Sequence, residues 1–194
     1  MEGNKSRCPW PANDPLMIKY HDKEWGTPLH NDRKLFEFLV LEGFQAGLSW
    51  LTILRKRENF RKAFDQFDFK KVAGYDQRKI NSLLNDSGII RNRLKIQGAI
   101  ANAKAFIEVR KEFGTFDKYI WGFTEGKIIH NDFKSLKEIP AKTELSDRIS
   151  KDLKGRGFKF VGSTIVYSHM QATGMVNDHL KECFRYKEIV QASV

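Results

Sequence analysis

Apolar residues recur at steps of three and four along nearly the whole of this chain, a spacing that places them on one face of successive helices. An all-α fold is therefore expected. A first strong helix should follow Asn31 and Asp32, either of which can cap its free amides, and Gly43 and Gly47 should interrupt it. Further helices are expected from position 49 and over 76–84, 91–112, 146–153 (with Ser146 as N-cap) and 162–173, while 119–133 is either a short hairpin or, more in keeping with its composition, loop or small helix.

The bulk composition limits the class of protein. The only cysteines are Cys8 and Cys183, so a secreted disulfide-rich scaffold is excluded and the thiols are free for other chemistry in a reducing compartment. The 34 Lys and Arg exceed the 24 Asp and Glu by 10, which is typical of proteins that bind a phosphate backbone. No run approaches the about 18 apolar residues of a membrane span, and 1–7 lacks the apolar core of a signal peptide. We expect an intracellular monomer, cytoplasmic and nucleoid-associated, with no membrane partner.

Two glycines, Gly155 and Gly157, stand one residue apart between two of the helical patterns. Glycine tolerates positive φ and lets bare backbone approach another surface, and the free amides at the start of the next helix can bind phosphate. An ordinary corner between two helices would use the same residues, so the segment alone leaves both interpretations open.

The same segment resembles the hairpin of the helix-hairpin-helix DNA-repair glycosylases, which runs Leu-Pro-Gly-x-Gly-x-Lys-x-Ala. Leu153, Gly155, Gly157 and Lys159 fit this pattern, and Val161 takes the last small apolar place. The resemblance implies that the motif, expected over 146–173, grips a DNA backbone through Gly155, Gly157 and Lys159 without reading sequence.

Two residues near the hairpin bear on the reaction type. Glycosylases of this superfamily that also cleave the strand have a nucleophilic lysine at the place of Lys159, and most members have a catalytic aspartate about twenty residues later. Asp178 lies near that second place but adjoins His179, so we treat it as a second-choice carboxylate. No feature of the sequence indicates the depressed amine pKa that strand cleavage through Lys159 would need.

Longer strings resemble one family, DNA-3-methyladenine glycosylase I. These are the stretches 20–26 (YHDKEWG), 41–50 (LEGFQAGLSW) and 157–162 (GFKFVG), and the likeness extends from Cys8 to Cys183. The resemblance implies a single glycosylase unit over 1–194 with two helical lobes and a base pocket between them. Its expected activity is hydrolysis of the bond between 3-methyladenine and the sugar of alkylated double-stranded DNA, after the base is flipped out.

Glu42 is the candidate catalytic residue. It continues the helical spacing of Leu35, Phe38 and Leu39, so it should be partly desolvated, which is a property of site carboxylates and of structural ion pairs alike. The resemblance favours the site, because a glutamate at this place in the family hydrogen-bonds the flipped base.

Aromatic residues form the candidate base pocket. Taken alone, Tyr20, Trp50, Trp10 and Trp25 are more typical of core packing than of a site. The resemblance implies that Tyr20 and Trp50 line the pocket, and Trp10 is assigned to base binding or support with Trp25 behind it. Attached 3-methyladenine is cationic, and a desolvated aromatic face prefers a cation by about 1–2 kcal/mol.

The cationic base also makes strong acid catalysis dispensable, because the leaving group already carries the charge that an acid would supply. We expect Glu42 to bind the amino edge of the base and to add negative potential near the developing oxocarbenium ion. No general base for water is evident. Phe44 and Met17 depart from residues found in some relatives, so the pocket is predicted only at Glu42, Tyr20 and Trp50 in detail.

A metal site is expected from both ends of the chain. His179 and Cys183 are four residues apart on one helical face, but this spacing also occurs by chance. The resemblance implies that Cys8, His21, His179 and Cys183 bind one Zn²⁺ that ties the termini together. Four protein ligands would leave no open position, so the ion would be structural. His30, His130 and His169 have no such pattern and are expected at the surface or in packing.

Two other functions remain open from the sequence. One is a non-catalytic DNA-binding helix-hairpin-helix module, and the other is a bifunctional glycosylase/lyase that uses Lys159. In every case the basic runs 55–57 and 91–95 are predicted to contact phosphates.

Overall fold

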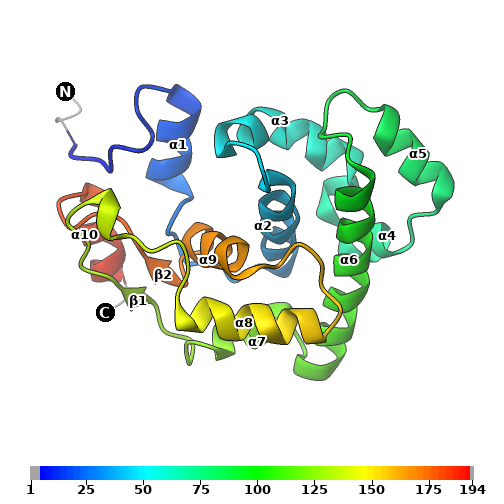
Figure 1. The fold of residues 1–194 in the computed structure, drawn as a ribbon. Helices are drawn as coiled ribbons and strands as arrows, with labels where there is room; N and C mark the ends of the chain where they lie inside the picture. Colours follow the sequence, from blue (N-terminus) through cyan, green and yellow to red (C-terminus); the bar gives the residue numbers. More distant parts are fainter. Residues whose placement is uncertain (1–4, 193–194) are drawn as a thin grey trace.

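The computed structural model describes residues 5–192 and is built almost entirely of helices, as expected (Figure 1). The helices are α1 (Pro15–Lys23), α2 (Asp32–Gln45), α3 (Trp50–Ala63), α4 (Phe69–Ala73), α5 (Gln77–Asn85), α6 (Arg93–Phe113), α7 (Phe116–Gly122), α8 (Glu144–Gly155), α9 (Ser163–Ala172) and α10 (Phe184–Ala192), with 3-10 turns η1 (Asp65–Phe67) and η2 (Leu136–Glu138). Among the helices of this described part, none is long and apolar enough to cross a bilayer.

Helix α2 is the centre of the molecule. Every residue from Leu35 to Phe44 is buried, and α3, α6, α7 and α9 all pack on it (Figure 1). Phenylalanine rings join it to its neighbours: Phe36 meets Phe106 of α6 at 5.2 Å and Phe44 meets Phe60 of α3 at 4.8 Å between ring centroids. A helix enclosed on all sides holds its polar side chains in fixed positions, because close packing leaves them no room to move.

Side-chain caps place the ends of the main helices. Asn31, one of the two predicted cap residues, caps α2 through the amide of Lys34. Ser49 caps α3 through the amide of Thr52. Gly114, with φ of 84°, ends α6.

Several helix boundaries were predicted wrongly. Gly43 does not interrupt α2, which runs on to Gln45. Ser146 is not the N-cap of α8: Thr143 is, and Ser146 donates its hydroxyl to the Thr143 carbonyl while accepting the Thr143 amide in a capping box. Helix α6 begins at Arg93 after the cap residue Asn92, two residues later than expected.

The segment 119–133 contains no local hairpin. It holds the end of α7, a turn, and strand β1 (Ile129–His130), which pairs in parallel with the distant strand β2 (Val176–Asn177). This small sheet brings the chain after α9 beside the middle of the sequence. As a result α1 and α10 lie on the same side of the molecule (Figure 1).

The hairpin between α8 and α9 is held firmly to the central helices. Gly157 takes φ of 91°, whereas Gly155 ends α8 without a positive φ. Phe160 lies over two glycines: a Cβ on Gly98 of α6 would come within 2.7 Å of its ring, and one on Gly43 of α2 within 3.3 Å of its Cβ. Gly98 is therefore needed for this close approach, and a side chain at Gly43 would make a tight contact.

Candidate functional site: an aromatic cavity around Glu42

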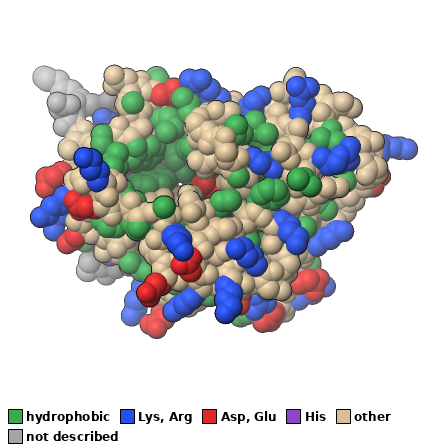
Figure 2. Space-filling model, viewed as in Figure 1, with side chains coloured by type: hydrophobic (Ala, Val, Ile, Leu, Met, Phe, Trp, Pro, Cys, Tyr) green, Lys and Arg blue, Asp and Glu red, His purple; other side chains and the backbone are tan. Residues whose placement is uncertain are grey.

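A cavity of about 240 Å³ opens beside α2, and Figure 2 shows a hollow lined with hydrophobic side chains on this face. The residues that line it come from the N-terminal segment, from α1 and the turn after it, from α2, α3 and α9, and from the loop that contains Ile139. The cavity therefore depends on elements from both ends of the sequence. Its lining includes Trp10, Tyr20, Glu42 and Trp50, so the structure brings together all of the predicted catalytic and base-binding residues.

Glu42 is the unpaired acid of this cavity. It is 4% exposed, and none of residues 5–192 offers its carboxyl a hydrogen bond or an ion pair. Burial raises the pKa of Glu42 to about 8, so the free protein holds it largely protonated at neutral pH.

Glu37, five residues earlier on α2, shows what an ordinary buried acid looks like in this helix. It is 6% exposed, accepts hydrogen bonds from Arg57 at 2.6 Å and Arg61 at 2.8 Å, and lies outside the cavity lining. This structural carboxylate is thus neutralised by two arginines, whereas Glu42 has no partner in the described structure.

The aromatic walls are held by one another. Tyr20 and Trp50 lie 5.3 Å apart between ring centroids, and Trp50 also stacks on Phe38 at 6.4 Å. Burial raises the pKa of Tyr20 well above its usual value, so its phenol stays neutral. The indole nitrogens of Trp10 and Trp50 are both buried without a hydrogen-bond partner in the described structure.

Asp178, the second-choice carboxylate, does not line the cavity. It is 1% exposed and accepts hydrogen bonds from Tyr167 Oη at 2.5 Å, Asn131 Nδ2 at 2.7 Å and Gln171 Nε2 at 2.8 Å. Gln171 does line the cavity, as does Ser168 on the same helix. Sequence reasoning missed both, because nothing in the local pattern of α9 distinguishes them from other polar positions.

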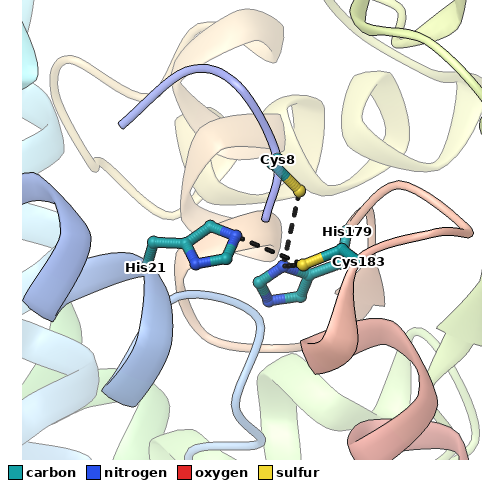
Figure 3. A group of neighbouring side chains, drawn as sticks. All are labelled: Cys8, His21, His179 and Cys183. Carbon is teal, nitrogen blue, oxygen red and sulfur yellow. Dashed lines mark hydrogen bonds between the residues drawn. The ribbon is translucent and has the colours of Figure 1, made fainter. Parts of the chain in front are cut away.

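A second cluster consists of two cysteines and two histidines, drawn in Figure 3. Cys8, His21, His179 and Cys183 are all buried, and their ligand atoms lie within 4.8 Å of one another. Cys183 Sγ is 3.5 Å from His21 Nε2 and 3.6 Å from His179 Nδ1, and Cys8 Sγ is 3.7 Å from His179 Nδ1. Neighbouring ligands of a tetrahedral zinc ion, with bonds of about 2.0–2.3 Å, are roughly 3.5 Å apart. The four side chains therefore fit such an ion.

The surroundings of the cluster also suit metal ligands. His179 Nε2 donates to the carbonyl of Trp25 at 2.9 Å, which leaves Nδ1 without a proton and directed at the thiols. His21 Nδ1 contacts Asp22 at 2.7 Å, and Arg7 holds that carboxylate. A hydrogen bond from Cys8, helped by the two histidines, lowers the pKa of Cys183 and so favours the thiolate that binds metal.

Trp10 and Trp25 link this cluster to the cavity. Trp10 lies 5.3 Å from the His21 ring and 6.3 Å from Tyr20, and Trp25 lies 4.6 Å from the His179 ring, between centroids. Both tryptophans line the cavity as well. The wall of the cavity is consequently packed directly on the candidate metal ligands.

The hairpin side chains lie elsewhere. Lys159 is exposed and does not line the cavity. Lysine and arginine side chains cover the neighbouring surface over α8 in Figure 2, where Arg148, Lys151 and Lys154 are exposed.

The two basic runs are less accessible than predicted. In 55–57 only Arg55 is exposed, because Arg57 is buried in its ion pairs with Glu37 and Glu24. In 91–95, Lys95 is also buried and donates to the carbonyls of Phe44 and Ala46, closing the end of α2. Arg57 and Lys95 are thus committed to contacts within the protein and are not available to phosphates.

The histidines outside the cluster differ in their exposure to solvent. His30 is exposed and contacts Asp117 at 2.8 Å, while His169 of α9 is buried. Burial lowers the pKa of His169 to about 4, so it is neutral and acts as a packing residue, as expected.

Comparison with known proteins gives consistent results along most of the chain. A sequence model of the family described as methyladenine glycosylase matches residues 10–186. The chain is 50% identical over 180 residues to DNA-3-methyladenine glycosylase 1 of Escherichia coli K12, covering 93% of this chain and 96% of that protein. It is 48% identical over 178 residues to DNA-3-methyladenine glycosylase of Haemophilus influenzae, covering 92% and 96%.

Solved structures agree in shape. A crystal structure of 3-methyladenine DNA glycosylase I superposes with a TM-score of 0.90 at 50% identity, over 92% of this chain and 98% of that one. A structure of the Staphylococcus aureus enzyme, described as showing how 3-methyladenine is recognised, has a TM-score of 0.90 at 35% identity, over 94% and 97%.

Proposed function

Since the chain belongs to the methyladenine glycosylase family, it is an enzyme that hydrolyses 3-methyladenine from alkylated DNA, and we propose that the cavity around Glu42 holds the extruded base. The observation that supports this assignment is the carboxyl of Glu42, buried among aromatic rings and unpaired within residues 5–192. Burying an acid without a partner destabilises the fold. We therefore take the ligand to be the partner of Glu42.

The charge of the substrate explains how such a site works. The base of a 3-methyladenine nucleotide carries a positive charge, and a cation beside Glu42 favours the ionised carboxylate. Tyr20 and Trp50 offer aromatic faces to the same cation. The empty cavity therefore prefers a neutral Glu42, and the filled one a carboxylate paired with the base.

Bond cleavage then needs little acid catalysis. As the bond between the base and the sugar carbon breaks, its electron pair neutralises the cationic base, which leaves without taking a proton. The positive charge passes to the sugar as an oxocarbenium ion, and the ionised Glu42 stabilises it until water adds to the same carbon and loses a proton.

The hairpin and nearby basic residues provide the DNA grip in this proposal. Gly155 and Gly157 have open space around them, and the exposed Lys159 can reach a phosphate. Arg93, the first residue of α6, and Arg91 just before the helix are both exposed and are further candidates. The partner is alkylated duplex DNA inside the cell, in the cytoplasm and at the nucleoid, and the whole of 1–194 acts as one monomeric unit with the pocket between two helical lobes.

We further infer that Cys8, His21, His179 and Cys183 hold one structural Zn²⁺. Two thiolates and two imidazoles complete a tetrahedron, so bound zinc would link the N-terminal segment to the C-terminal one and leave no position for water. Its role would be to keep Trp10 and Trp25 in place behind the pocket.

The test is release of free bases from methylated duplex DNA, followed by chromatography. Glu42→Gln should lower the rate at least about a hundredfold, as removal of a single transition-state electrostatic contact does in other enzymes. Glu37→Gln is the matched control, because it removes an equally buried acid of the same helix outside the cavity. It should weaken the fold while the correctly folded fraction keeps its activity.

The other two functions give different results. A DNA-binding module would release no base from any version of the protein. A lyase using Lys159 would form a covalent DNA adduct that borohydride traps, whereas the exposed position of Lys159 outside the cavity lining favours hydrolysis alone. Unchanged base release by Glu42→Gln would overturn the assignment of the cavity.

A further inference from the structure

Asp178 is a buried acid that the proposed chemistry does not use. Its three hydrogen-bond donors, Tyr167, Asn131 and Gln171, are all neutral, and Oδ2 accepts from both Tyr167 and Gln171. Tyr167 and Asn131 lie outside the cavity lining, whereas Gln171 belongs to it. Gln171 is therefore the connection between Asp178 and the cavity.

The contact with Asp178 fixes which way the Gln171 amide faces. A carboxylate only accepts hydrogen bonds, so the amide nitrogen must face it, and the opposite orientation would set two oxygens 2.8 Å apart. The carbonyl oxygen Oε1 then lies on the other side of the amide. In the described part of the chain no donor contacts Oε1, and it is not among the buried atoms without a partner. It is a free, accessible acceptor on a residue that lines the cavity.

We propose that Gln171, oriented by Asp178, determines specificity by accepting a hydrogen bond from the amino group of a 6-aminopurine through Oε1. The inference rests on the function proposed above. An exocyclic amino group has two hydrogens, so Glu42 of α2 and Gln171 of α9 can each accept one of them. A guanine-type base has a carbonyl oxygen at the same position. That oxygen would face Oε1 of Gln171, another acceptor, and the contact with Asp178 prevents the Gln171 amide from rotating to offer a donor.

This arrangement gives selectivity that cation recognition alone cannot. Both 3-methyladenine and 3-methylguanine are cationic in DNA, so aromatic faces and the charge of Glu42 favour both. A fixed acceptor distinguishes them, because the wrong base leaves buried polar groups facing each other without a proton between them.

The experiment measures kcat/KM for release of 3-methyladenine and of 3-methylguanine from the same methylated duplex, and takes their ratio. A ratio does not depend on the fraction of folded protein. Gln171→Leu should lower the preference for 3-methyladenine about tenfold, the effect of one hydrogen bond. Asn131→Leu is the control, because it removes a donor from Asp178 and leaves the contact with Gln171. Its ratio should equal that of the wild type.

Asp178→Asn tests the positioning role. An asparagine can face Gln171 with its oxygen or its nitrogen, so the Gln171 amide becomes free to turn and the ratio should fall. In the Gln171→Leu background the same change should have no further effect on the ratio, since Asp178 acts only through Gln171.

A purely structural role would instead change both rates equally and leave every ratio as in the wild type, which would overturn the proposal. So would an additive effect in the double variant. A wild-type protein that releases neither base refutes the proposed function itself and is distinguishable from both of these outcomes.

Discussion

The side chain of Asn102 holds both hydrogen-bonding atoms of the Lys159 backbone: its Nδ2 donates to the carbonyl oxygen at 3.0 Å, and its Oδ1 accepts from the amide at 2.6 Å. Asn102 is 3% exposed in the middle of α6, so the hairpin is tied to the interior of the protein at the residue predicted to contact phosphate. The exposed loop is thus held in one conformation before DNA arrives, which reduces the entropy cost of binding.

Replacing Asn102 by alanine should therefore separate DNA binding from base binding. Two backbone groups lose their partner, which should lower the free energy of unfolding by about 2 kcal/mol and loosen the hairpin. Duplex affinity, measured by fluorescence anisotropy, should fall, while affinity for free 3-methyladenine, measured by tryptophan fluorescence, should not. Gln97→Ala, at an exposed site of the same helix, should change neither.

Glu42→Gln should stabilise the protein as it inactivates it. Burial raises the pKa of Glu42 from 4.5 to about 8, so the native state keeps a proton that the unfolded chain releases between these values. The wild type consequently loses stability as pH rises from 4.5 to 8, and the glutamine variant does not. At pH 7 the free energy of unfolding of the variant should exceed that of the wild type by about 3 kcal/mol, because pH 7 lies about 2.5 units above the unfolded pKa and each unit contributes about 1.36 kcal/mol. Urea unfolding at pH 5 and pH 7 measures it, and equal stabilities at pH 7 would contradict the burial of an unpaired acid.

The rate should depend on pH through the same group. If the ionised Glu42 is the active form, kcat/KM should rise about tenfold per pH unit below pH 8 and level off above it, because this parameter reports the free enzyme. The kcat profile should rise at lower pH, since the bound cation favours the carboxylate. A profile of kcat/KM that is flat from pH 6 to pH 9 would exclude this role for Glu42.

Removing zinc should weaken the fold and then the pocket. Bound zinc would cross-link the chain between Cys8 and Cys183. Its loss should lower the free energy of unfolding by about 5 kcal/mol, the value for opening a loop of this length, and should lower Tm by roughly 10–20 °C for a domain of this size. Elemental analysis should find one zinc ion per chain, and scanning calorimetry with and without a chelator measures the shift. Added Zn²⁺ should restore Tm and added Mg²⁺ should not. A chelated protein with unchanged Tm would show that the four side chains do not hold a structural ion.

Some of this site could be predicted from residue spacing and some could not. The helical spacing through Leu35, Phe38 and Leu39 placed Glu42 on a buried face, because the periodicity of a long helix is local information. Helix α1 was not predicted, although Asp14 as N-cap and Pro15 at the first position mark its start. Its few apolar residues gave too weak a stripe for the periodic pattern to find.

Contacts between distant segments could not be predicted from the local sequence pattern. The charged run at 55–57 has the composition of a DNA-binding surface, yet Arg57 is buried because Glu37 and Glu24 neutralise it from two other elements. The bond between Gln171 and Asp178 forms only because the chain reverses after α9 through Gly174, with φ of 73°. Tertiary packing decides such pairs, and a single sequence does not display it.

Phe160 rests on Gly43, the residue that directly follows Glu42. If the hairpin binds DNA as proposed, the hairpin and Glu42 belong to one rigid part of the protein. The distance between the bound phosphate and the reacting sugar is then set by the protein. The duplex must then bend to bring a damaged base to the cavity, because the protein does not adjust this distance. A lesion that makes the DNA more flexible should therefore reach the cavity more often than an equally charged base in stiff DNA.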